Sequence, residues 1–474
     1  MTVEHERRLE RLKTYFRDDV VLPGDRQWDR ARAAWNLAVD QRPAAVVRPH
    51  TAEDVSRVVR FAADVGLHVA PQATGHNPGP LPSLENVILL KTDRMRGVRI
   101  DPHSHRAQAG GGAVWWDVAE PAGCEGMAPL AGSSPDVGVA GYTLGGGLSW
   151  LGRKYGLAAN SVTAMVVVTA DGTIRRADRE SEPELFWALR GGGGNFGVVT
   201  GLEFAIYPVP ELYAGWLVWS MDRARDVMEA WTEWLAGVPD DVTSILRLMQ
   251  VPAIPVMPEP LRGRDLVVVE AAMLLPERKA RDLLGPLRRL RPEIDTFARI
   301  PPAALSHLHM DPDAPVPAMG DSRLLREMSP STIDAIVASV GPGTASPLAA
   351  VEIRHLGGEL GRPQLDGGAL SHFDAEFLLF GAGIPTDPET ADAIRRRLDV
   401  LFDRTRTWDV GHRYSNFVEG RTDPRRLFPE RVYRRLAELR ARLDPHGLFL
   451  ANHAVPGSPY PPDSGAKLGE RAEA

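Results

Sequence analysis

The sequence is poor in the features that define several classes of protein. Its 474 residues contain one cysteine, Cys124, which excludes internal disulfides and cysteine-based metal clusters. No apolar run is long enough to cross a membrane, and the charged N-terminus lacks the apolar core of a signal peptide. The net charge of −7 argues against nucleic acid as the main partner. We therefore expect a cytoplasmic protein with no membrane, nucleic-acid or metal site.

Two common nucleotide-binding motifs are also missing. No G-x-x-x-x-G-K-[ST] occurs, so a P-loop is excluded. The run 192–197 fits the letters G-x-G-x-x-G, but that fingerprint must follow a strand and open a helix. Here a helix comes first, with Ser181 and Glu184 as its capping box, and the β-rich run 198–206 follows. An NAD-type site is therefore excluded as well.

The organisation of the chain is that of a globular protein with two or three domains. Hydrophobic residues make up 43% and charged residues 25% of the chain, and no internal repeat is found. A β-α-β unit is predicted over 44–70, with Thr51 capping its helix and Gly66 ending it. The pair Asp171-Gly172 predicts a hairpin between 164–169 and 173–176. The composition changes at 208–210, where we expect a domain boundary.

Glycine is abundant, and three clusters of it lie between residues 132 and 197. Backbone N–H groups without a neighbouring Cβ can surround an anion such as a phosphate. Tight turns between strands are the alternative for any one cluster. Three clusters separated by apolar segments favour a large nucleotide cofactor.

A histidine, His76, lies in a loop rich in glycine and proline directly after a predicted strand. No H-E-x-x-H and no cysteine pair accompanies it, so nothing indicates a metal ligand. On this stretch alone, a surface loop histidine is the alternative to a functional residue.

Five segments of the chain together carry a resemblance to a known family. They are Ala-Thr-Gly-His-Asn at 73–77, the glycine-rich segments 132–147 and 185–197, Tyr-Ser-Asn-Phe at 414–417, and the terminal segment 443–452. In this order they resemble the berberine-bridge-enzyme-like FAD-linked oxidases of the vanillyl-alcohol-oxidase or p-cresol-methylhydroxylase (PCMH) superfamily. The match runs over nearly the whole chain.

The resemblance implies an α+β, two-domain FAD-binding PCMH-type fold. The FAD domain would comprise residues 1–207, with its core at about 38–207, and would be completed by the C-terminal segment 411–456. The intervening residues 208–410 would form the substrate domain, an antiparallel sheet backed by helices. Residues 457–474 are expected to be a disordered tail.

The resemblance also implies that FAD is bound covalently. His76 holds the position of the histidine that the family bonds to the flavin 8α-methyl group. Ser134 stands where many members have a second, cysteinyl link, so a single link is expected, with Ser133 and Ser134 donating hydrogen bonds to the flavin. The residues expected at the cofactor are Thr74, Gly75, His76, Asn77, Ser133, Ser134, Asp136, Gly138, Gly141, Tyr142, Gly145, Gly146, Asn195, Gly197, Val198, Asn416 and Asn452.

Three residues are candidates for the chemistry. Tyr414 matches the tyrosine of the family signature and is the first candidate for the catalytic base, with a buried tyrosine bonded to backbone as the alternative. A phenol needs a nearby cation to act as a base at neutral pH, and Arg413 or His412 is expected to supply it. Glu352 is the second candidate, with a structural Glu352–Arg354 ion pair as the alternative. Tyr142 is expected to line the flavin or the oxygen side.

The function implied is hydride transfer from an alcohol, amine or activated C–H group of a small organic substrate to FAD, which O2 reoxidises to give H2O2. The composition suggests a bacterial enzyme of secondary metabolism. An oxygenase-type tailoring enzyme, a carbohydrate oxidase and a dehydrogenase that excludes oxygen are alternatives within enzymes. A non-catalytic flavin-binding protein is the alternative from another class. The oligomeric state is left open.

Overall fold

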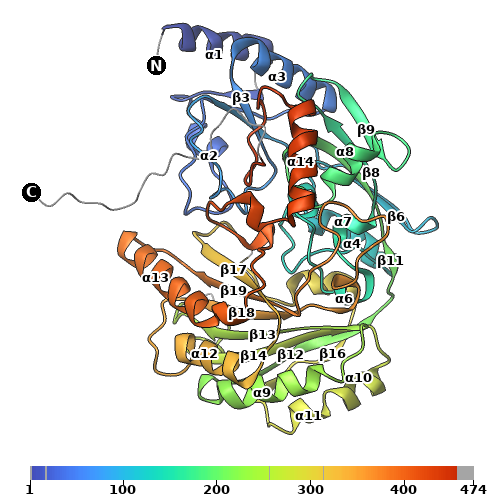
Figure 1. Cartoon of the computed structure of the whole chain (residues 1–474), viewed down its shortest axis with the longest axis vertical. Helices are drawn as coiled ribbons and strands as arrows, with labels where there is room; N and C mark the ends of the chain where they lie inside the picture. Colours follow the sequence, from blue (N-terminus) through green and yellow to red (C-terminus); the bar gives the residue numbers. More distant parts are fainter. Residues whose placement is uncertain (1–2, 17–18, 256, 313, 456–474) are drawn as a thin grey trace, which may run out of the picture.

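The structure is a computed structural model that describes residues 3–16, 19–255, 257–312 and 314–455. Two parts can be distinguished, each built on its own sheets (Figure 1). The first part contains a four-stranded and a five-stranded sheet, and the second part contains an eight-stranded sheet. Helices and strands follow one another in no regular order along the chain. The fold is therefore α+β.

The four-stranded sheet contains the predicted β-α-β unit. Its order is β1 (Val20–Val21), β2 (Ala45–Val47), β4 (Val87–Lys91), β3 (His68–Gln72). The last three strands are parallel, and α3 (Ala52–Val65) makes the crossover between β2 and β3. Thr51 and Asp54 form the capping box of α3, and Gly66 ends the helix with a φ of 69°. The predicted helix is confirmed. It is preceded by α1 (Val3–Phe16) and α2 (Trp28–Arg32).

The five-stranded sheet is antiparallel throughout. Its order is β5 (Val98–Asp101), β6 (Arg106–Gly110), β10 (Val198–Ala205), β8 (Val162–Val168), β9 (Ile174–Asp178). The hairpin of β8 and β9 is as predicted: the Asp171 carboxylate accepts hydrogen bonds from the Thr169 hydroxyl at 2.6 Å and the Thr173 amide at 3.0 Å. The remaining elements of this part are α4 (Trp115–Cys124), β7 (Met127–Ala128), α5 (Val139–Leu144), α6 (Gly152–Tyr155), α7 (Ala158–Ser161), α8 (Pro183–Leu189) and β11 (Tyr207–Pro208).

The capping box predicted for α8 is wrong. The residue before the helix is Glu182, which has a φ of 54° and makes no side-chain capping bond. Ser181 instead belongs to the turn after β9, where the Asp178 carboxylate accepts hydrogen bonds from the amides of Glu180 and Ser181. Asp178 thus accepts the hydrogen bond from the Ser181 amide that the predicted capping box assigned to Glu184.

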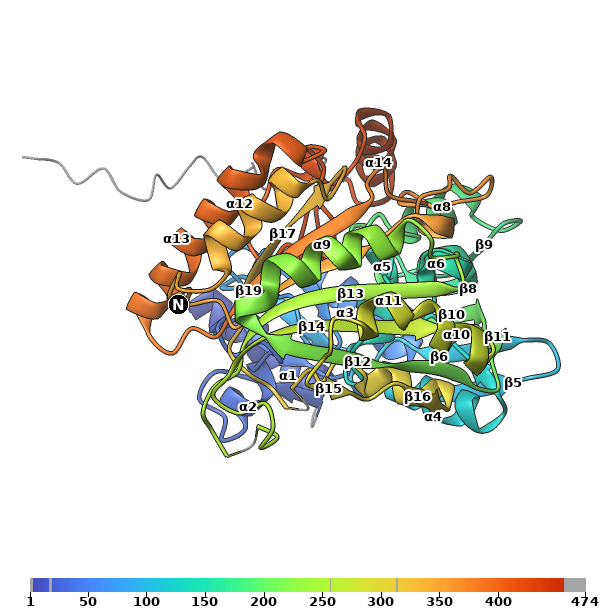
Figure 2. The same ribbon diagram turned by 90° about the horizontal axis from the view of Figure 1, so that it is seen from below.

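The second part is an eight-stranded antiparallel sheet with helices on one face (Figure 2). The strands are β12 (Leu212–Ser220), β13 (Val242–Gln250), β14 (Asp265–Met273), β15 (Ile294–Asp295), β16 (Ala298–Ile300), β17 (Met319–Leu325), β18 (Ala350–His355) and β19 (Phe377–Gly383). The helices are α9 (Ala224–Leu235), α10 (Glu277–Leu283), α11 (Gly285–Arg288), α12 (Pro330–Val340) and α13 (Pro388–Thr405). Short 3-10 turns lie at Met221–Arg223, Pro302–His307, Gly358–Leu360, Arg406–Trp408, Ser415–Phe417 and Pro424–Arg426.

The two faces of this sheet differ in character along β18. Val351 and Ile353 join the apolar core between sheet and helices. Glu352 and Arg354 point to the other face and line a cavity against the first part. A sheet that is apolar on one face and charged on the other positions polar side chains toward whatever the cavity holds.

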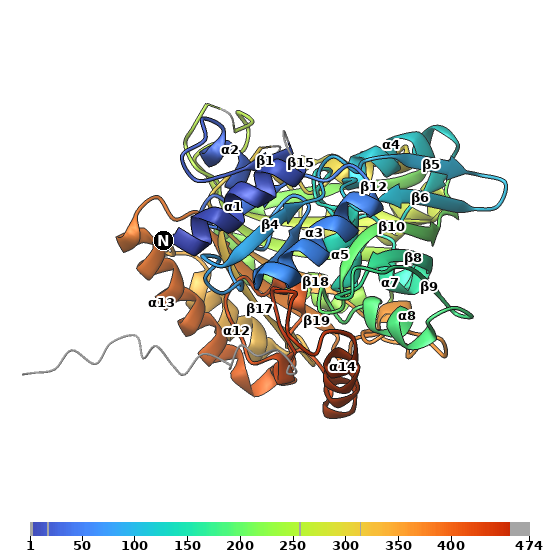
Figure 3. The same ribbon diagram turned by 90° about the horizontal axis from the view of Figure 1, so that it is seen from above.

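The C-terminal segment returns to the first part of the molecule. Helix α14 (Glu430–Leu443) packs against α8 (Figure 3). At this contact the Arg435 guanidinium lies 3.8 Å from the centroid of the Trp187 ring. Leu448 and Leu450 then exchange backbone hydrogen bonds with Val69 of β3 at 2.9 Å. This path is the one expected for a split first domain. The domain limits themselves stay predictions, and the expected tail 457–474 lies outside the described residues.

Candidate functional site

The glycine clusters, the His76 loop and the charged face of the second sheet meet at one cavity of about 440 Å³. Fifteen of the residues singled out from the sequence line it: Thr74, Gly75, His76, Asn77, Ser133, Ser134, Gly138, Gly141, Tyr142, Gly145, Gly197, Val198, Glu352, Asn416 and Asn452. Four others are not part of this lining: Asp136, Gly146, Asn195 and Tyr414. The cavity has the size of a ligand site.

The glycines that line the cavity have no side chain to cover the backbone there. A Cβ added to Gly141 or Gly194 would meet no heavy atom within 4 Å, so the space beside both residues is open. Gly145 is required for another reason, since a Cβ there would fall 1.8 Å from the Asn416 side-chain oxygen. Asn195 closes the third cluster from behind, donating to the Gly192 carbonyl at 2.9 Å. The clusters therefore form a cradle of the kind that a nucleotide cofactor such as FAD requires.

His76 is held in one orientation at the wall of the cavity. Its ring stacks on Trp35 with the ring centroids 4.2 Å apart and the planes at 18°. Thr74 Oγ1 lies 2.7 Å from Nδ1, and Asp136 Oδ1 lies 3.3 Å from Nε2. Gly75 has a φ of 82°, which places His76 on the inside of the turn.

Asp136 is the centre of this arrangement. Its carboxylate also accepts hydrogen bonds from the Ser134 hydroxyl at 2.9 Å and from the Trp35 indole. Burial alone would raise the pKa of Asp136, but the contact with His76 and the hydrogen bonds from Ser134 and Trp35 hold that pKa below its usual value. A negative charge therefore stays beside the imidazole at neutral pH.

The two serines differ from expectation. Ser134 donates its hydroxyl proton to Asp136, and Ser133 donates its own to the Asp311 carboxylate at 3.0 Å. Each hydroxyl has one proton, so what these oxygens offer the cavity is lone pairs. The expectation that both serines donate to a flavin does not fit this geometry.

Tyr414 has the environment of a buried tyrosine bonded to the backbone, which was the alternative to a catalytic base. Its side chain is buried, and its hydroxyl oxygen accepts hydrogen bonds from the Gly147 amide at 2.9 Å and the Asn416 amide at 3.0 Å. Burial raises the pKa of the phenol far above 10, and Arg413, expected to lower it, binds Asp321 at 3.1 Å instead. The geometry favours a tyrosine that fixes the glycine turn at Gly147.

Tyr142 contributes a ring to the wall of the cavity. Its hydroxyl donates to the Leu130 carbonyl at 3.1 Å, and its ring meets Trp115 edge-on. Burial raises the pKa of this phenol as well. Tyr142 therefore shapes the cavity, and its proton is engaged in a backbone hydrogen bond.

Glu352 faces the cavity as one member of a buried charge cluster. Arg354 donates from Nε at 2.9 Å and from Nη2 at 2.7 Å to Glu352 Oε2, so the ion pair considered from the sequence is present. His309 Nε2 lies 2.9 Å from Glu352 Oε1. Burial alone would raise the pKa of Glu352, but Arg354 and His309 outweigh it and hold the pKa far below its usual value.

Sequence reasoning missed His309, Glu270, Arg247 and Glu419. The first three complete the cluster behind Glu352: Arg247 and Glu270 come from the paired strands β13 and β14, and His309 comes from a loop. Glu419 lines the cavity, and its burial raises its pKa to about 7. The available signal was the alternation along β13 and β14, which places Arg247 and Glu270 on the same face as Glu352.

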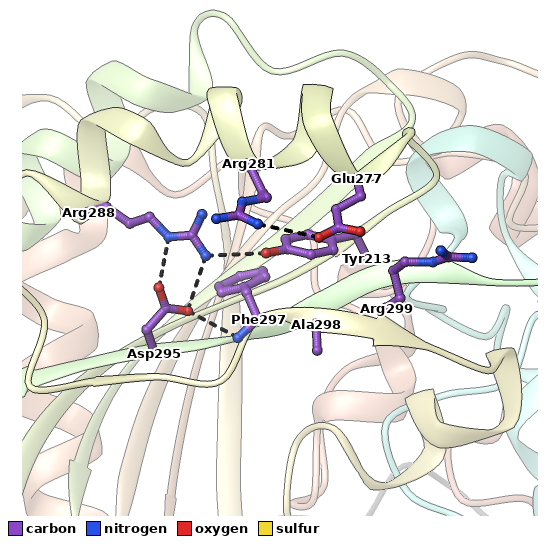
Figure 4. A pocket seen from close by; sticks show the side chains of 8 residues that line it. All are labelled: Tyr213, Glu277, Arg281, Arg288, Asp295, Phe297, Ala298 and Arg299. Carbon is purple, nitrogen blue, oxygen red and sulfur yellow. Dashed lines mark hydrogen bonds and ion pairs between the residues drawn. The ribbon is translucent and has the colours of Figure 1, made fainter.

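A second hollow, of about 500 Å³, lies beneath α10 and α11 on the outer side of the molecule (Figure 4). It contains three arginines, but each has an acidic partner. Arg281 pairs with Glu277, Arg288 with Asp295 and Arg299 with Glu211. Its charges are thus balanced internally, and it carries none of the residues singled out from the sequence.

The described ranges of the chain offer neither a metal site nor a membrane-spanning helix. No group of histidine, cysteine, aspartate and glutamate side chains there is arranged to hold a metal ion. No helix in those ranges has the length and apolar character needed to span a bilayer.

The chain is similar to known FAD-binding proteins. A family model described as an FAD binding domain matches residues 43–178. The (R)-6-hydroxynicotine oxidase of Paenarthrobacter nicotinovorans is 37% identical over 203 residues, which are 43% of this chain and 44% of that protein. The xylooligosaccharide oxidase of Thermothelomyces thermophilus is 32% identical over 46% of this chain and 45% of that protein. The matched region thus spans less than half the length of these curated relatives.

Solved structures extend the likeness to nearly the whole chain. The 6-hydroxy-D-nicotine oxidase of Arthrobacter nicotinovorans has a TM-score of 0.79 at 25% identity, over 91% of this chain and 96% of that one. The wild-type BBE-like 1 protein of Physcomitrella patens has a TM-score of 0.81 at 19% identity, over 94% of this chain and 99% of that one. The second likeness shows the fold alone.

Proposed function

The chain belongs to the berberine-bridge-enzyme-like FAD-linked oxidases, and from this premise we propose that it oxidises a small organic substrate by hydride transfer to covalently bound FAD. One observation carries the proposal: the glycine cradle, His76 and Glu352 line the same cavity. Bound FAD would supply the two-electron acceptor, which dioxygen regenerates with release of hydrogen peroxide. We further propose that residues 1–207 and 411–456 form the FAD domain and residues 208–410 the substrate domain.

His76 is the residue proposed to carry the covalent link. Its ring is fixed by Trp35 and Thr74, and Nε2 lies beside the Asp136 carboxylate, whose negative charge faces the imidazole. A second link would need a thiol at the cavity. Cys124 is exposed at the end of α4 and Ser134 occupies the nearer position, so a single link is expected.

Glu352 is the residue proposed to accept the substrate's proton. Its carboxylate faces the cavity, whereas the Tyr414 hydroxyl is buried behind the lining and engaged by two donors. A weakly basic carboxylate suffices when the O–H or N–H becomes strongly acidic as the hydride leaves the neighbouring carbon. Tyr414 then acts by holding the Gly147 turn.

The substrate class proposed is a small alcohol or amine. The curated relatives are named as oxidases of 6-hydroxynicotine and of oligosaccharides, which makes a carbohydrate oxidase the second candidate. Matches named as FAD-dependent monooxygenases keep an oxygenase-type reaction as a further alternative. A cytoplasmic bacterial enzyme of secondary metabolism remains our expectation for the setting.

The test is anaerobic mixing of the purified holoenzyme with a substrate panel. The panel contains both enantiomers of 6-hydroxynicotine, xylobiose, cellobiose and a series of aryl alcohols. Loss of the flavin's visible absorbance identifies a substrate, and one hydrogen peroxide per turnover in air identifies an oxidase. Incorporation of labelled oxygen without peroxide would favour the oxygenase. A flavin that no compound reduces, and that dioxygen does not reoxidise after photoreduction, would indicate a non-catalytic flavoprotein.

A further inference from the structure

Five charged side chains form a continuous line from the interior of the second sheet to the cavity. Arg247 binds Glu270, Glu270 Oε2 lies 2.6 Å from His309 Nδ1, and His309 Nε2 lies 2.9 Å from Glu352 Oε1. Arg354 completes the line on Glu352 Oε2. His309 and Glu270 are essentially inaccessible, with 1% and 0% of their side-chain surface exposed. Glu352 and Arg354 line the cavity.

The two carboxylates favour a proton on each nitrogen of His309, although an Arg354 N–H also lies 3.4 Å from Nε2. Both ring nitrogens face carboxylate oxygens, and a carboxylate can only accept. The charges then alternate along the line from Arg247 to Arg354. Burial and Arg247 disfavour the imidazolium, but Glu270 and Glu352 outweigh them and raise the pKa of His309 to about 9.

The loop that carries His309 is built to hold it. Met310 has a φ of 55°, a conformation that few side chains adopt, and its own side chain is exposed. This turn lets the residues on both sides of it point inward: His309 to Glu352, and Asp311 to the Ser133 hydroxyl. Strained backbone of this kind is found where a side chain must be placed accurately.

The same loop is fastened to the first part of the molecule. Asn36 donates to the Ala318 carbonyl and accepts from the Ala318 amide, each at 3.0 Å, and the Leu37 amide donates to the Val316 carbonyl. His309 is thus fixed relative to the glycine cradle as well as to the sheet. A group held from both sides can set the direction of Glu352 toward a bound cofactor.

We propose that His309, supported by Glu270, is a positioning residue that holds Glu352 as an oriented carboxylate; this rests on the proposed role of Glu352. Arg354 occupies Oε2 with two N–H groups, and His309 takes one lone pair of Oε1. The remaining lone pair of Oε1 is the one available to a substrate O–H or N–H. In the reaction the substrate's proton moves to that oxygen, and the proton on His309 Nε2 stays in place.

Loss of the His309 proton at high pH should undo this arrangement. The groups that face His309 are Glu270 from β14, Arg247 from β13 through Glu270, Glu352 and Arg354 from β18, Asp311 of its own loop with Oδ1 at 4.0 Å, and the edge of the Trp150 ring. A neutral imidazole with its one proton held by Glu270 would turn a lone pair toward Glu352 Oε1. That contact is repulsive, so Glu352 would move or take up a proton.

The first test needs no substrate. Holoenzyme labelled with 15N-histidine is titrated by NMR, and the His309 signals are assigned by their absence in His309→Gln. We expect both ring nitrogens to be protonated at pH 7.5 and to titrate near pH 9, and to titrate at least one pH unit lower in Glu270→Gln. A His309 ring that is neutral at pH 7.5 would overturn the proposal, whatever the substrate is.

The second test uses any compound that reduces the flavin. The rate constant of reduction should fall above pH 9 in the wild type, and this alkaline limb should be absent from His309→Gln and shifted to lower pH in Glu270→Gln. At pH 7.5, His309→Gln should lower the rate constant on the order of 10- to 100-fold, with a smaller change in KM. An unchanged alkaline limb in both variants would refute the positioning role.

The matched control is His355→Gln. His355 is a buried histidine on β18 that contacts Arg153, and it is expected to leave the alkaline limb in place. Thermal unfolding and flavin content establish that each variant is folded, and Glu270→Gln serves if His309→Gln is not. Full activity of Glu352→Gln would refute the proposed base while the NMR titration still decides the state of His309.

Discussion

The imidazole of His76 lies flat against the indole of Trp35, with ring centroids 4.2 Å apart and 18° between the planes. The same indole donates to Asp136, whose other oxygen lies 3.3 Å from His76 Nε2. Trp35 therefore restrains the histidine from its face and, through Asp136, from its edge. A residue restrained in this way loses little entropy when it forms a further bond.

We predict that His76→Ala abolishes covalent attachment of the flavin. Denaturation should release all flavin from this variant and none from the wild type, in which peptide mass mapping should find the flavin on the peptide that contains His76. Ser134→Ala is the control, because Ser134 lies beside Asp136 but is not expected to form a link. Flavin that stays attached to His76→Ala would mean that another residue carries the link.

Glu352→Gln should lower the rate constant of flavin reduction by about 10²–10⁴-fold, the usual contribution of a general base. The amide keeps the size of the side chain but cannot accept the substrate's proton. Stopped-flow reduction with an active compound from the panel measures the effect. A rate constant within threefold of the wild type would assign the base elsewhere.

Tyr414→Phe should affect stability more than the rate of flavin reduction, in contrast to Glu352→Gln. We expect less than a tenfold change in the reduction rate, since the hydroxyl lies behind the cavity lining. Stability should fall by about 1–3 kcal/mol, because the Gly147 amide loses its buried acceptor. Denaturant unfolding measures this loss. A large loss of rate with unchanged stability would restore Tyr414 as the first candidate for the base.

The parts of the structure set by local patterns could be predicted from the sequence. Thr51 and Gly66 mark α3 because a cap and a C-terminal glycine act within one helical turn. The Glu352–Arg354 ion pair could be considered because residues two apart on one strand share a face. His309 was missed because its partners lie on strands 39 and 43 residues away in the chain. The site of Tyr414 could not be judged either, since burial of its hydroxyl depends on the Gly147 turn.

Helix α14 illustrates the same limit and leads to a stability prediction. Arginines on an amphipathic helix usually form a solvated face, but Arg440 is fully buried. Its guanidinium donates to the Asn195 backbone and side-chain oxygens at 2.9 and 2.8 Å and to the Phe449 carbonyl at 2.7 Å. It joins the C-terminal segment to the third glycine cluster.

Arg440→Met should therefore destabilise the protein by about 3–5 kcal/mol, because Asp444 and the Asn195 oxygens lose a buried cation. Denaturant unfolding of the holoenzyme, followed by flavin fluorescence and far-UV circular dichroism, measures it. Arg434→Met on the same helix removes an exposed pair with Glu430 and should cost under about 1 kcal/mol. Equal losses in the two variants would contradict the structural role of Arg440.

Glu419 gives the stability a pH dependence whose sign can be worked out. Burial, together with the nearby Asp321 charge, raises its pKa from 4.5 to about 7, although the Gly320 amide hydrogen bond opposes the change. Between these pH values the folded protein keeps a proton that the unfolded chain has lost, so this residue makes stability fall as pH rises from 4.5 to 7. Glu419→Gln replaces the carboxyl with an amide that does not titrate, so it removes this contribution to the pH dependence of stability.

The variant and the wild type should unfold at similar temperatures near pH 4.5. Above pH 7 the variant should be the more stable, by roughly 2–4 °C, because it no longer has to hold a charged carboxylate at the wall of the cavity. Differential scanning fluorimetry across this range measures the difference, with the exposed Glu389→Gln on α13 as the control that shows no trend. A difference that is constant with pH, or that grows toward acid, would mean that Glu419 is charged in the folded protein at neutral pH.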